Sequence, residues 1–137
     1  MTEERIAQKT GRILEYVRLL RDIQEDCVRR FHTDPIYRGA LLHYLYLMAD
    51  SCIALAVLMI KHKGLRPPQT YAEAFDILGS HGILESEFAY AFAKIAGFRN
   101  LLAHDYETID EQLICSALPA GLDEVEKYIA QIQNAQK

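Results

Sequence analysis

The sequence contains few of the residues that interrupt helices, because only four prolines and seven glycines occur among 137 residues. It also lacks any run in which apolar and polar residues alternate, which is the pattern of a half-buried strand. Half of the residues are hydrophobic, enough to form a core in a chain of this length. These observations predict a single all-α domain over residues 1–137, built as an antiparallel bundle of about five helices.

Cysteine is also scarce. The three cysteines, Cys27, Cys52 and Cys115, are odd in number, and none belongs to a C-x-x-C motif. We therefore expect buried thiols in a reducing compartment. The first five residues, MTEER, carry no basic and apolar secretion signal. Both features favour a cytoplasmic protein.

Several common kinds of site have no counterpart in the sequence. The five histidines show neither an H-E-x-x-H pattern nor the paired spacing of zinc ligands. There is no glycine-rich phosphate loop and no G-x-S-x-G motif. We therefore expect neither a metal nor a cofactor.

Helical periodicity and end signals divide the chain into segments. Asp34 followed by Pro35 is a helix start, Thr70 and Glu73 form a capping box, and Ser86 is placed to cap a further helix. The predicted helices are residues 3–28, 35–63, 70–78, a helix from 86 that carries residues 88–102, a continuation over 109–118, and 122–133, with Pro119-Ala120-Gly121 separating the last two.

Residues 41–60 are almost entirely apolar and long enough to suggest a membrane span. Against a span, Asp50 lies at the centre, where a carboxylate in lipid costs roughly 2.5–3.5 kcal/mol on insertion scales. A helix that is apolar on every side can instead be covered by its own bundle on one face and by a second copy on the other. We therefore expect no membrane association and a homodimer. The residues expected at the dimer interface are Tyr44, Tyr46, Leu47 and Met48.

The motif R-x4-H-x-Y, formed by Arg99, His104 and Tyr106, ends an apolar helical run. On an unbroken helix Arg99 and Tyr106 share a face, whereas His104 lies about 140° round from Arg99. The three side chains therefore meet only if the helix loosens near Ala103 or if a second copy supplies part of the site. The alternative is that Arg99 and Asp105 are surface charges and His104 is a residue that favours the helix dipole.

Asp50 needs a partner if it is buried. Arg99 is the candidate, through a bidentate, charge-assisted pair. A hydrogen bond from a nearby hydroxyl or amide is the alternative.

Charge is unevenly distributed along the chain. The net charge of −4 argues against a general nucleic-acid binder, but the first 68 residues carry eleven Lys and Arg against eight acids. A local basic surface is one interpretation, and ordinary solvated helix faces are the other. The basic residues concerned are Arg18, Arg21, Arg29, Arg30, Arg38, Lys61, Lys63 and Arg66. The acidic C-terminal third is expected to face away from any RNA.

Two blocks are distinctive together: G-L-R-P-P at residues 64–68 and G-F-R-N-L-L-A-H-D-Y at residues 97–106. With the segments around them they cover nearly the whole chain, which resembles the HepT-like (YutE-like, formerly domain of unknown function 86) ribonuclease toxins of the HEPN superfamily. The resemblance implies an HEPN-like dimeric bundle and a metal-independent endoribonuclease with its motif at the dimer interface. It also implies the toxin half of a toxin–antitoxin pair, whose MntA-like nucleotidyltransferase antitoxin adds AMP to Tyr106.

One stretch departs from the family pattern. Relatives often carry a glutamate followed by an A-C-I-D-I-A run, whereas here Asp50 replaces the glutamate and Ala54 the later aspartate. A role for that second acid therefore does not carry over.

The chemistry of the motif agrees with RNA cleavage. Arg99 has a planar, permanently charged guanidinium suited to phosphate oxygens, and a histidine such as His104 can move a proton near neutral pH. We expect these two to be catalytic, with Asn100, Tyr106 and Asp50 in substrate-binding or supporting roles. Two other hypotheses are a non-catalytic, nucleotide-binding or structural partner of a nucleotidyltransferase, and a purely structural dimerising bundle.

Overall fold

A computed structural model of the protein describes residues 2–136, and these form only helices and connecting loops. The predicted all-α antiparallel bundle is confirmed. The elements are α1 (Thr2–Ile23), η1 (Gln24–Asp26), α2 (Cys27–Arg30), α3 (Pro35–His62), α4 (Tyr71–Ser80), α5 (Ser86–Phe92), α6 (Ile95–His104), η2 (Tyr106–Thr108) and α7 (Glu111–Gln136).

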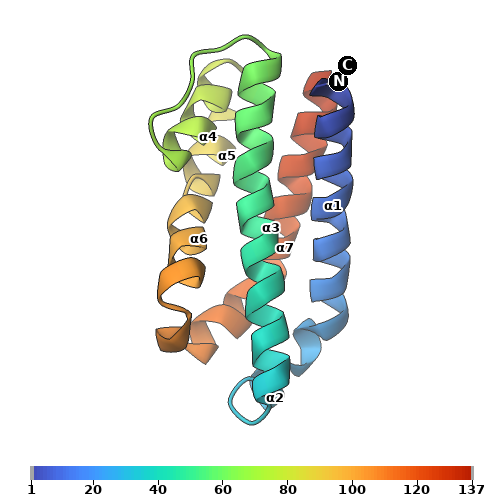
Figure 1. The fold of residues 1–137 in the computed structure, drawn as a ribbon, viewed down its shortest axis with the longest axis vertical. Helices are drawn as coiled ribbons and strands as arrows, with labels where there is room; N and C mark the ends of the chain where they lie inside the picture. Colours follow the sequence, from blue (N-terminus) through green and yellow to red (C-terminus); the bar gives the residue numbers. More distant parts are fainter. Residues whose placement is uncertain (1, 137) are drawn as a thin grey trace.

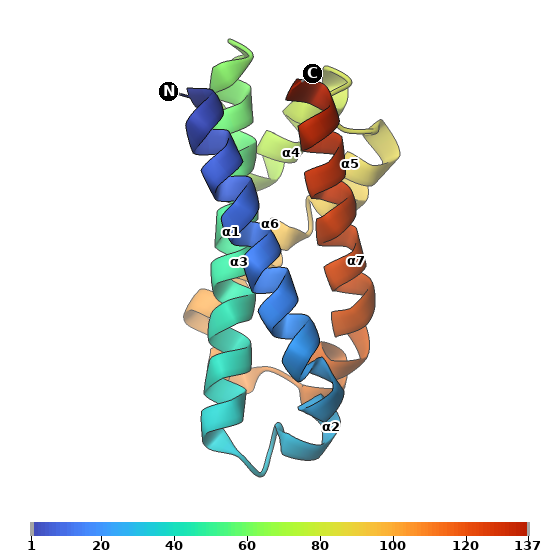
Figure 2. The same cartoon turned by 90° about the vertical axis from the view of Figure 1, so that its right-hand side faces the viewer.

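Helix α3 occupies the centre of the bundle. It packs against α1 on one side and against α4 and α6 on the other, with α7 beside α1 (Figure 1). Turning the molecule by 90° shows α1, α3 and α7 running along its length (Figure 2). Both ends of the described chain lie at the same end of the bundle, and the short helix α2 lies at the other (Figures 1 and 2).

The ends of α3 follow the sequence signals. The Asp34 side chain accepts hydrogen bonds from the backbone N–H groups of Ile36 (3.1 Å) and Tyr37 (3.0 Å), with Pro35 as the first helical residue. The hydrogen bond from Arg30 and these two N–H groups hold the pKa of Asp34 below its usual value. At the other end, Gly64 adopts a φ of +68°, a conformation that terminates helices.

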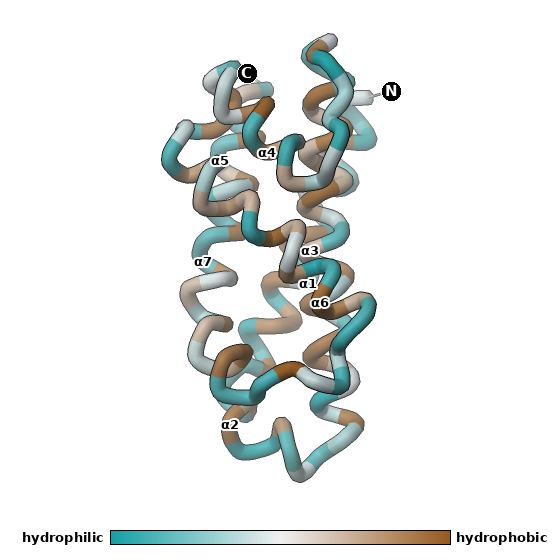
Figure 3. The backbone as a smooth tube through the Cα atoms, turned by 90° about the vertical axis from the view of Figure 1, so that its left-hand side faces the viewer, coloured by the Kyte–Doolittle hydropathy of each residue, from teal (hydrophilic) through white to brown (hydrophobic). Residues whose placement is uncertain are grey.

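By length and composition α3 could cross a membrane, but 56% of its apolar window is buried inside the bundle. Its apolar residues therefore form the core of the fold. Figure 3 shows hydrophobic residues recurring along the helices and alternating with hydrophilic ones. An aromatic group of Phe75, Phe92 and Tyr128 fills one part of this core. The buried Tyr128 hydroxyl donates a 2.8 Å hydrogen bond to the Cys52 carbonyl, and burial raises the pKa of that hydroxyl.

The single helix predicted to start at Ser86 is wrong, because two short helices replace it. The chain turns at Ala93 and Lys94, where the Ala96 N–H donates to the Ala93 carbonyl over 3.1 Å. Helix α5 packs against α4 and α6 packs against α3, so the turn lets each apolar face reach a different neighbour. Ser86 is the first helical residue and not the cap, since Glu85 precedes it without a capping side-chain bond.

The predicted break at residues 119–121 is also wrong, because α7 continues through Pro119. Proline removes one backbone donor and kinks a helix without always ending it. Figure 1 shows α7 beginning obliquely near one end of the bundle before it runs alongside α1. Buried residues on both sides of Pro119, including Leu118 and Leu122, hold the two halves in one helix.

The expectation of three free thiols holds only for Cys52, which is buried and whose pKa is raised by burial. Cys27 and Cys115 form a disulfide across 88 residues of sequence, with their Cα atoms 5.5 Å apart. The fold places α2 beside the start of α7, a proximity that cysteine spacing does not reveal.

Candidate functional site

Arg99 of α6 points toward α3 and pairs with Asp50, as predicted. Its Nε atom donates to Asp50 Oδ1 over 3.1 Å. The pair uses this single hydrogen bond and is not bidentate, and the Asp50 side chain is 47% exposed, so it is not the deeply buried carboxylate assumed from the sequence. The remaining guanidinium nitrogens reach Asn100 Oδ1 (3.2 Å) and the Tyr46 hydroxyl (3.4 Å).

Two tyrosine rings flank the same guanidinium. The Arg99 Cζ atom lies 5.5 Å from the centroid of the Tyr46 ring and 5.7 Å from that of Tyr71. These distances are within the range of cation–π contacts. Tyr46 comes from α3 and Tyr71 is the first residue of α4, so three elements meet at Arg99. Sequence reasoning assigned no role to Tyr71, and its place beside the G-L-R-P-P block was the available signal.

Arg99 stays positively charged, and some of its N–H groups make no hydrogen bond within the described residues. The hydrogen bond to Asp50 raises the pKa of Arg99, while burial opposes that change. A guanidinium has five N–H donors. Three hydrogen bonds engage Arg99 within residues 2–136, which leaves two N–H groups for an anion.

The other motif residues lie at the exposed end of α6. His104 is the last residue of α6, and within the described chain its side chain makes no hydrogen bond or ion pair. Asp105 leaves the helical conformation, with φ −131° and ψ 26°, so α6 runs unbroken from Arg99 to His104 and ends only after His104, without the loosening near Ala103 that would bring the three side chains together. Tyr106 begins η2 and is 54% exposed. Within residues 2–136 of a single chain, however, neither His104 nor Tyr106 forms a hydrogen bond with Arg99.

Tyr106 lies in a cleft between η2 and the α2–α3 connection. Beside it are Phe31, His32, Arg38, Glu107 and Ile109. Arg38 is the basic side chain in this cleft.

A basic surface was one of two interpretations of eight Lys and Arg residues, and ion pairs neutralise most of these residues. Five of the eight basic residues pair with carboxylates: Arg18, Arg21, Arg29, Arg30 and Arg66. The interpretation as solvated helix faces therefore describes most of these residues better.

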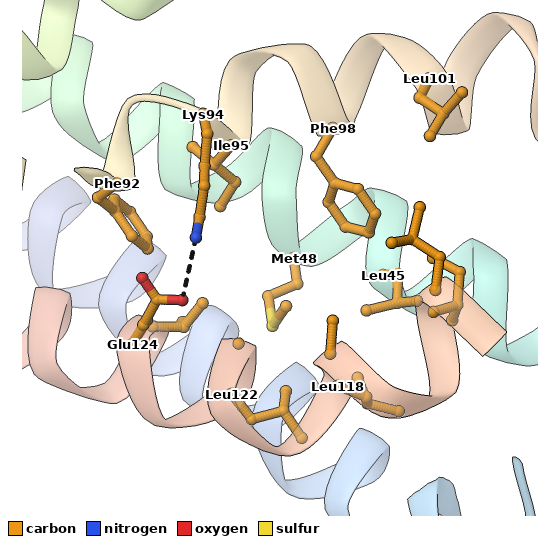
Figure 4. A pocket seen from close by; sticks show the side chains of 15 residues that line it. Leu45, Met48, Phe92, Lys94, Ile95, Phe98, Leu101, Leu118, Leu122 and Glu124 are labelled. Carbon is orange, nitrogen blue, oxygen red and sulfur yellow. Dashed lines mark ion pairs between the residues drawn. The ribbon is translucent and has the colours of Figure 1, made fainter. Parts of the chain in front are cut away.

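A hydrophobic groove of about 340 Å³ lies between α3, α6 and α7. Figure 4 shows Phe98 and Leu101 of α6 opposite Leu118 and Leu122 of α7, with Met48 of α3 between them. The ion pair of Lys94 and Glu124, 3.6 Å apart, spans the groove toward one end (Figure 4). Met48, one of the four residues expected at a dimer interface, lines this groove but is itself buried, with only 4% of its surface exposed. The full lining is Leu45, Met48, Phe92, Lys94, Ile95, Phe98, Leu101, Leu113, Ile114, Ala117, Leu118, Gly121, Leu122, Glu124 and Val125.

Among residues 2–136 there is no group of three or more His, Cys, Asp or Glu side chains placed to hold a metal ion. The polar chemistry of the candidate site therefore comes from Arg99, Asp50, Asn100, His104 and the neighbouring tyrosines.

Comparison with known proteins now identifies the family. Residues 13–132 match the model of the family described as ribonuclease HepT-like. The chain belongs to this family. A HepT-like relative from Shewanella oneidensis, named mRNA nuclease HepT, is 21% identical over 100 residues, which cover 73% of this chain and 75% of the relative. Another, named tRNA nuclease HepT, from Aphanizomenon flos-aquae, is 37% identical over 65 residues, 47% of this chain and 44% of the relative.

Solved structures share the HepT-like fold. One is a tri-AMPylated Shewanella oneidensis HEPN toxin in complex with its MNT antitoxin, with a TM-score of 0.84 and 20% identity, covering 94% of this chain and 96% of that one. Another is YutE of Bacillus subtilis, described as a cytosolic protein of unknown function, with a TM-score of 0.82 and 19% identity, covering 96% of this chain and 88% of that one. At these identities the likeness shows a common fold.

Proposed function

We propose that this protein is an endoribonuclease that cleaves RNA without a metal ion, and that Arg99 and His104 carry out the reaction. The observation that carries the proposal is the state of Arg99. Its guanidinium is fixed by Asp50, Asn100 and Tyr46 and keeps two N–H donors for phosphate. Membership of the ribonuclease HepT-like family and the RNA-cleaving activities named for two relatives support it.

The reaction follows from the chemistry of the two side chains. A neutral His104 removes the proton from a ribose 2′-hydroxyl, whose oxygen then attacks the adjacent phosphorus. Arg99 stabilises the negative charge that develops on the phosphate oxygens. The bond to the 5′-oxygen breaks, and that oxygen receives a proton from a protonated histidine. The products are a 2′,3′-cyclic phosphate and a 5′-hydroxyl.

A homodimer would complete this site. In one chain Arg99 and His104 are not joined by any hydrogen bond, and a second copy would supply the other histidine of an acid–base pair. We expect the second copy to pack on the part of α3 that carries Tyr44, Tyr46, Leu47 and Met48, where the Tyr46 hydroxyl contacts Arg99. We infer that the protein is located in the cytosol, as described for the YutE protein of similar fold.

Regulation by a nucleotidyltransferase antitoxin of the MntA type is the second part of the proposal. The Tyr106 side chain is 54% exposed and thus open to modification by another protein. Transfer of AMP to its hydroxyl would add a phosphodiester charge and bulk in the cleft beside Arg38 and near the end of α6. That group would compete with RNA phosphate. The AMPylated toxin of similar fold, bound to its antitoxin, supports this assignment.

The test is RNA cleavage by purified protein that mass spectrometry shows to be free of AMP, with a chelator present throughout. Messenger RNA and tRNA serve as substrates. The oligomeric state of the same sample is determined from the mass of the protein in solution. We expect cleavage that persists in chelator and falls by at least about 100-fold in His104→Ala, the scale of a lost general acid or base. The matched control is His81→Ala, which changes an exposed histidine at the end of α4 and should leave cleavage intact.

A non-catalytic, nucleotide-binding role beside a nucleotidyltransferase remains the second candidate. The observation that favours it is that Asp50 already pairs with Arg99 while His104 stays apart in the single chain. This hypothesis predicts that protein without AMP cleaves neither messenger RNA nor tRNA but still binds a nucleotide. It also predicts that His104→Ala changes neither the circular dichroism spectrum nor the affinity for that nucleotide.

A further inference from the structure

The tyrosine pair around Arg99 suggests a second binding element in the site. Tyr71 is the half-exposed member of the pair, with 49% of its surface accessible, and Tyr46 is more buried. One side of the Tyr71 ring lies near the Arg99 guanidinium, at 5.7 Å from Cζ to the ring centroid. About half of the Tyr71 surface is thus accessible to solvent beside a cation that has free donors.

We propose that the open face of Tyr71 binds a nucleobase of single-stranded RNA, so that the base stacks on the ring while its phosphate is bound by Arg99. This inference rests on RNA as the substrate of the proposed function. Aromatic side chains next to cationic groups are the usual elements of single-strand binding, since every base has a face that can stack. The chemistry predicts binding with little base preference.

The segment that carries Tyr71 is held in place by several hydrogen bonds. Thr70 caps α4 by accepting from the Glu73 N–H over 3.1 Å. The Glu73 carboxylate in turn accepts from the Gln69 N–H (2.9 Å) and from Arg66 (3.0 Å), and these contacts keep the pKa of Glu73 below its usual value. These hydrogen bonds fix the backbone at Tyr71, so the backbone loses little conformational freedom when a base stacks on the ring.

Tyr71 contacts Arg99 but lies on a different element from the other two motif residues, His104 and Tyr106. Tyr71 lies on α4, Arg99 on α6 and Tyr46 on α3, so a strand of RNA that contacts Tyr71 crosses the junction of three helices. His104 and Tyr106 lie further along, at and beyond the end of α6. Tyr71 is therefore inferred to bind a nucleotide that neighbours the cleaved bond.

The absence of tryptophan from the chain allows a direct test. Tyr71→Trp places a single fluorescent indole at the proposed base-stacking position. The His104→Ala background prevents cleavage of the RNA probe. The matched control is Tyr90→Trp in the same background, because Tyr90 is 83% exposed on α5 and is not among the hydrogen-bond or ring partners of Arg99. The probes are a short oligoribonucleotide, an abasic strand of equal length, and free AMP at the same base concentration.

We expect the oligoribonucleotide to quench the indole at position 71 and not at position 90, and the abasic strand to quench neither. Absence of quenching at position 71 would overturn the proposal. Equal quenching by free AMP would overturn its assignment to an RNA strand, since the site would then recognise a mononucleotide.

Variants without the introduced tryptophan, made in protein that keeps His104, give a second measurement. Tyr71→Leu should raise KM roughly tenfold, the scale of one lost base stack, whereas Tyr71→Phe should stay within about twofold because it keeps the aromatic face. Equal KM values for Tyr71→Leu and the parent would contradict base stacking on Tyr71 while leaving the ribonuclease proposal intact. Quenching by RNA in a protein that never cleaves RNA would have the opposite meaning: base stacking on Tyr71 stands and the ribonuclease proposal fails.

Discussion

Arg99 combines a charge that does not titrate in the physiological range with a geometry that its neighbours impose. Asp50 and Asn100 accept from two of its nitrogens, and Tyr46 and Tyr71 lie within cation–π distance of it. A lysine could retain the charge but not the planar fork that makes these contacts together. The function of Arg99 should therefore depend on its shape as much as on its charge.

We accordingly expect Arg99→Lys to lower kcat/KM for RNA cleavage by roughly 100-fold or more, the scale of a lost transition-state donor. Initial rates on one defined RNA provide the measurement. Arg18→Lys is the control, because Arg18 is an exposed arginine that pairs with Glu15 on α1. Equal rates for Arg99→Lys and the parent protein would show that a point charge is sufficient.

At the scale of single residues the sequence predicted one contact between residues 49 positions apart. The Asp50–Arg99 pair was predicted because a carboxylate inside an apolar helix requires a partner. Tyr71 was missed because it meets Arg99 through the packing of α4 against α3, and no periodicity within either segment encodes that contact. By contrast, Arg99 and His104 both lie on α6, so helical spacing alone predicts that their side chains point in different directions.

At the level of helices, end signals were more informative than helical periodicity. Asp34 and Thr70 cap the helices they were expected to cap, because side-chain and backbone groups a few residues apart form the bond. The turn at residues 93–94 and the continuous helix through Pro119 were not foreseen. Both depend on which distant element covers an apolar face, and spacings of three and four residues do not contain that information.

The disulfide between Cys27 and Cys115 connects α2 to the first turns of α7. Closing a long loop restricts the unfolded chain, so we expect Cys27→Ser to lower the free energy of unfolding by about 2–5 kcal/mol under non-reducing conditions. Denaturant unfolding with and without a reductant measures this. In reductant the parent and the variant should have nearly the same stability, and Cys115→Ser should match Cys27→Ser in both conditions. Identical parent and variant curves without reductant would contradict the expected stabilisation.

For the whole molecule, the carboxylates whose pKa values are shifted determine how stability depends on acidity. Asp26, Asp34 and Glu73 all have folded-state pKa values below the ordinary ones, chiefly because of hydrogen bonds from Arg29, from Arg30 and from the Gln69 N–H respectively. A depressed folded pKa means that the unfolded chain takes up protons first as the pH falls. The stability these groups contribute is therefore complete above their unfolded pKa values and is lost as the pH falls through the folded ones.

As far as these groups are concerned, we expect the unfolding temperature to change little between neutral pH and about pH 5. At pH values below about 4 we expect the unfolding temperature to decrease. Thermal unfolding followed by circular dichroism across this range provides the measurement. The triple variant Asp26→Asn, Asp34→Asn, Glu73→Gln should be less stable at neutral pH and should lose less stability on acidification. A parallel decrease in both proteins would place the acid-sensitive groups elsewhere.

The two ends of the described chain lie together at the end of the bundle remote from α2 and η2 (Figures 1 and 2). Tyr106, which begins η2, is thus at the opposite end from both Thr2 and Gln136. A domain fused to either end would extend away from the surface that a modifying enzyme must reach. For an engineer, this geometry would allow a second protein to be attached at one end of the bundle while the other end stays accessible to RNA and to the nucleotidyltransferase proposed to modify Tyr106.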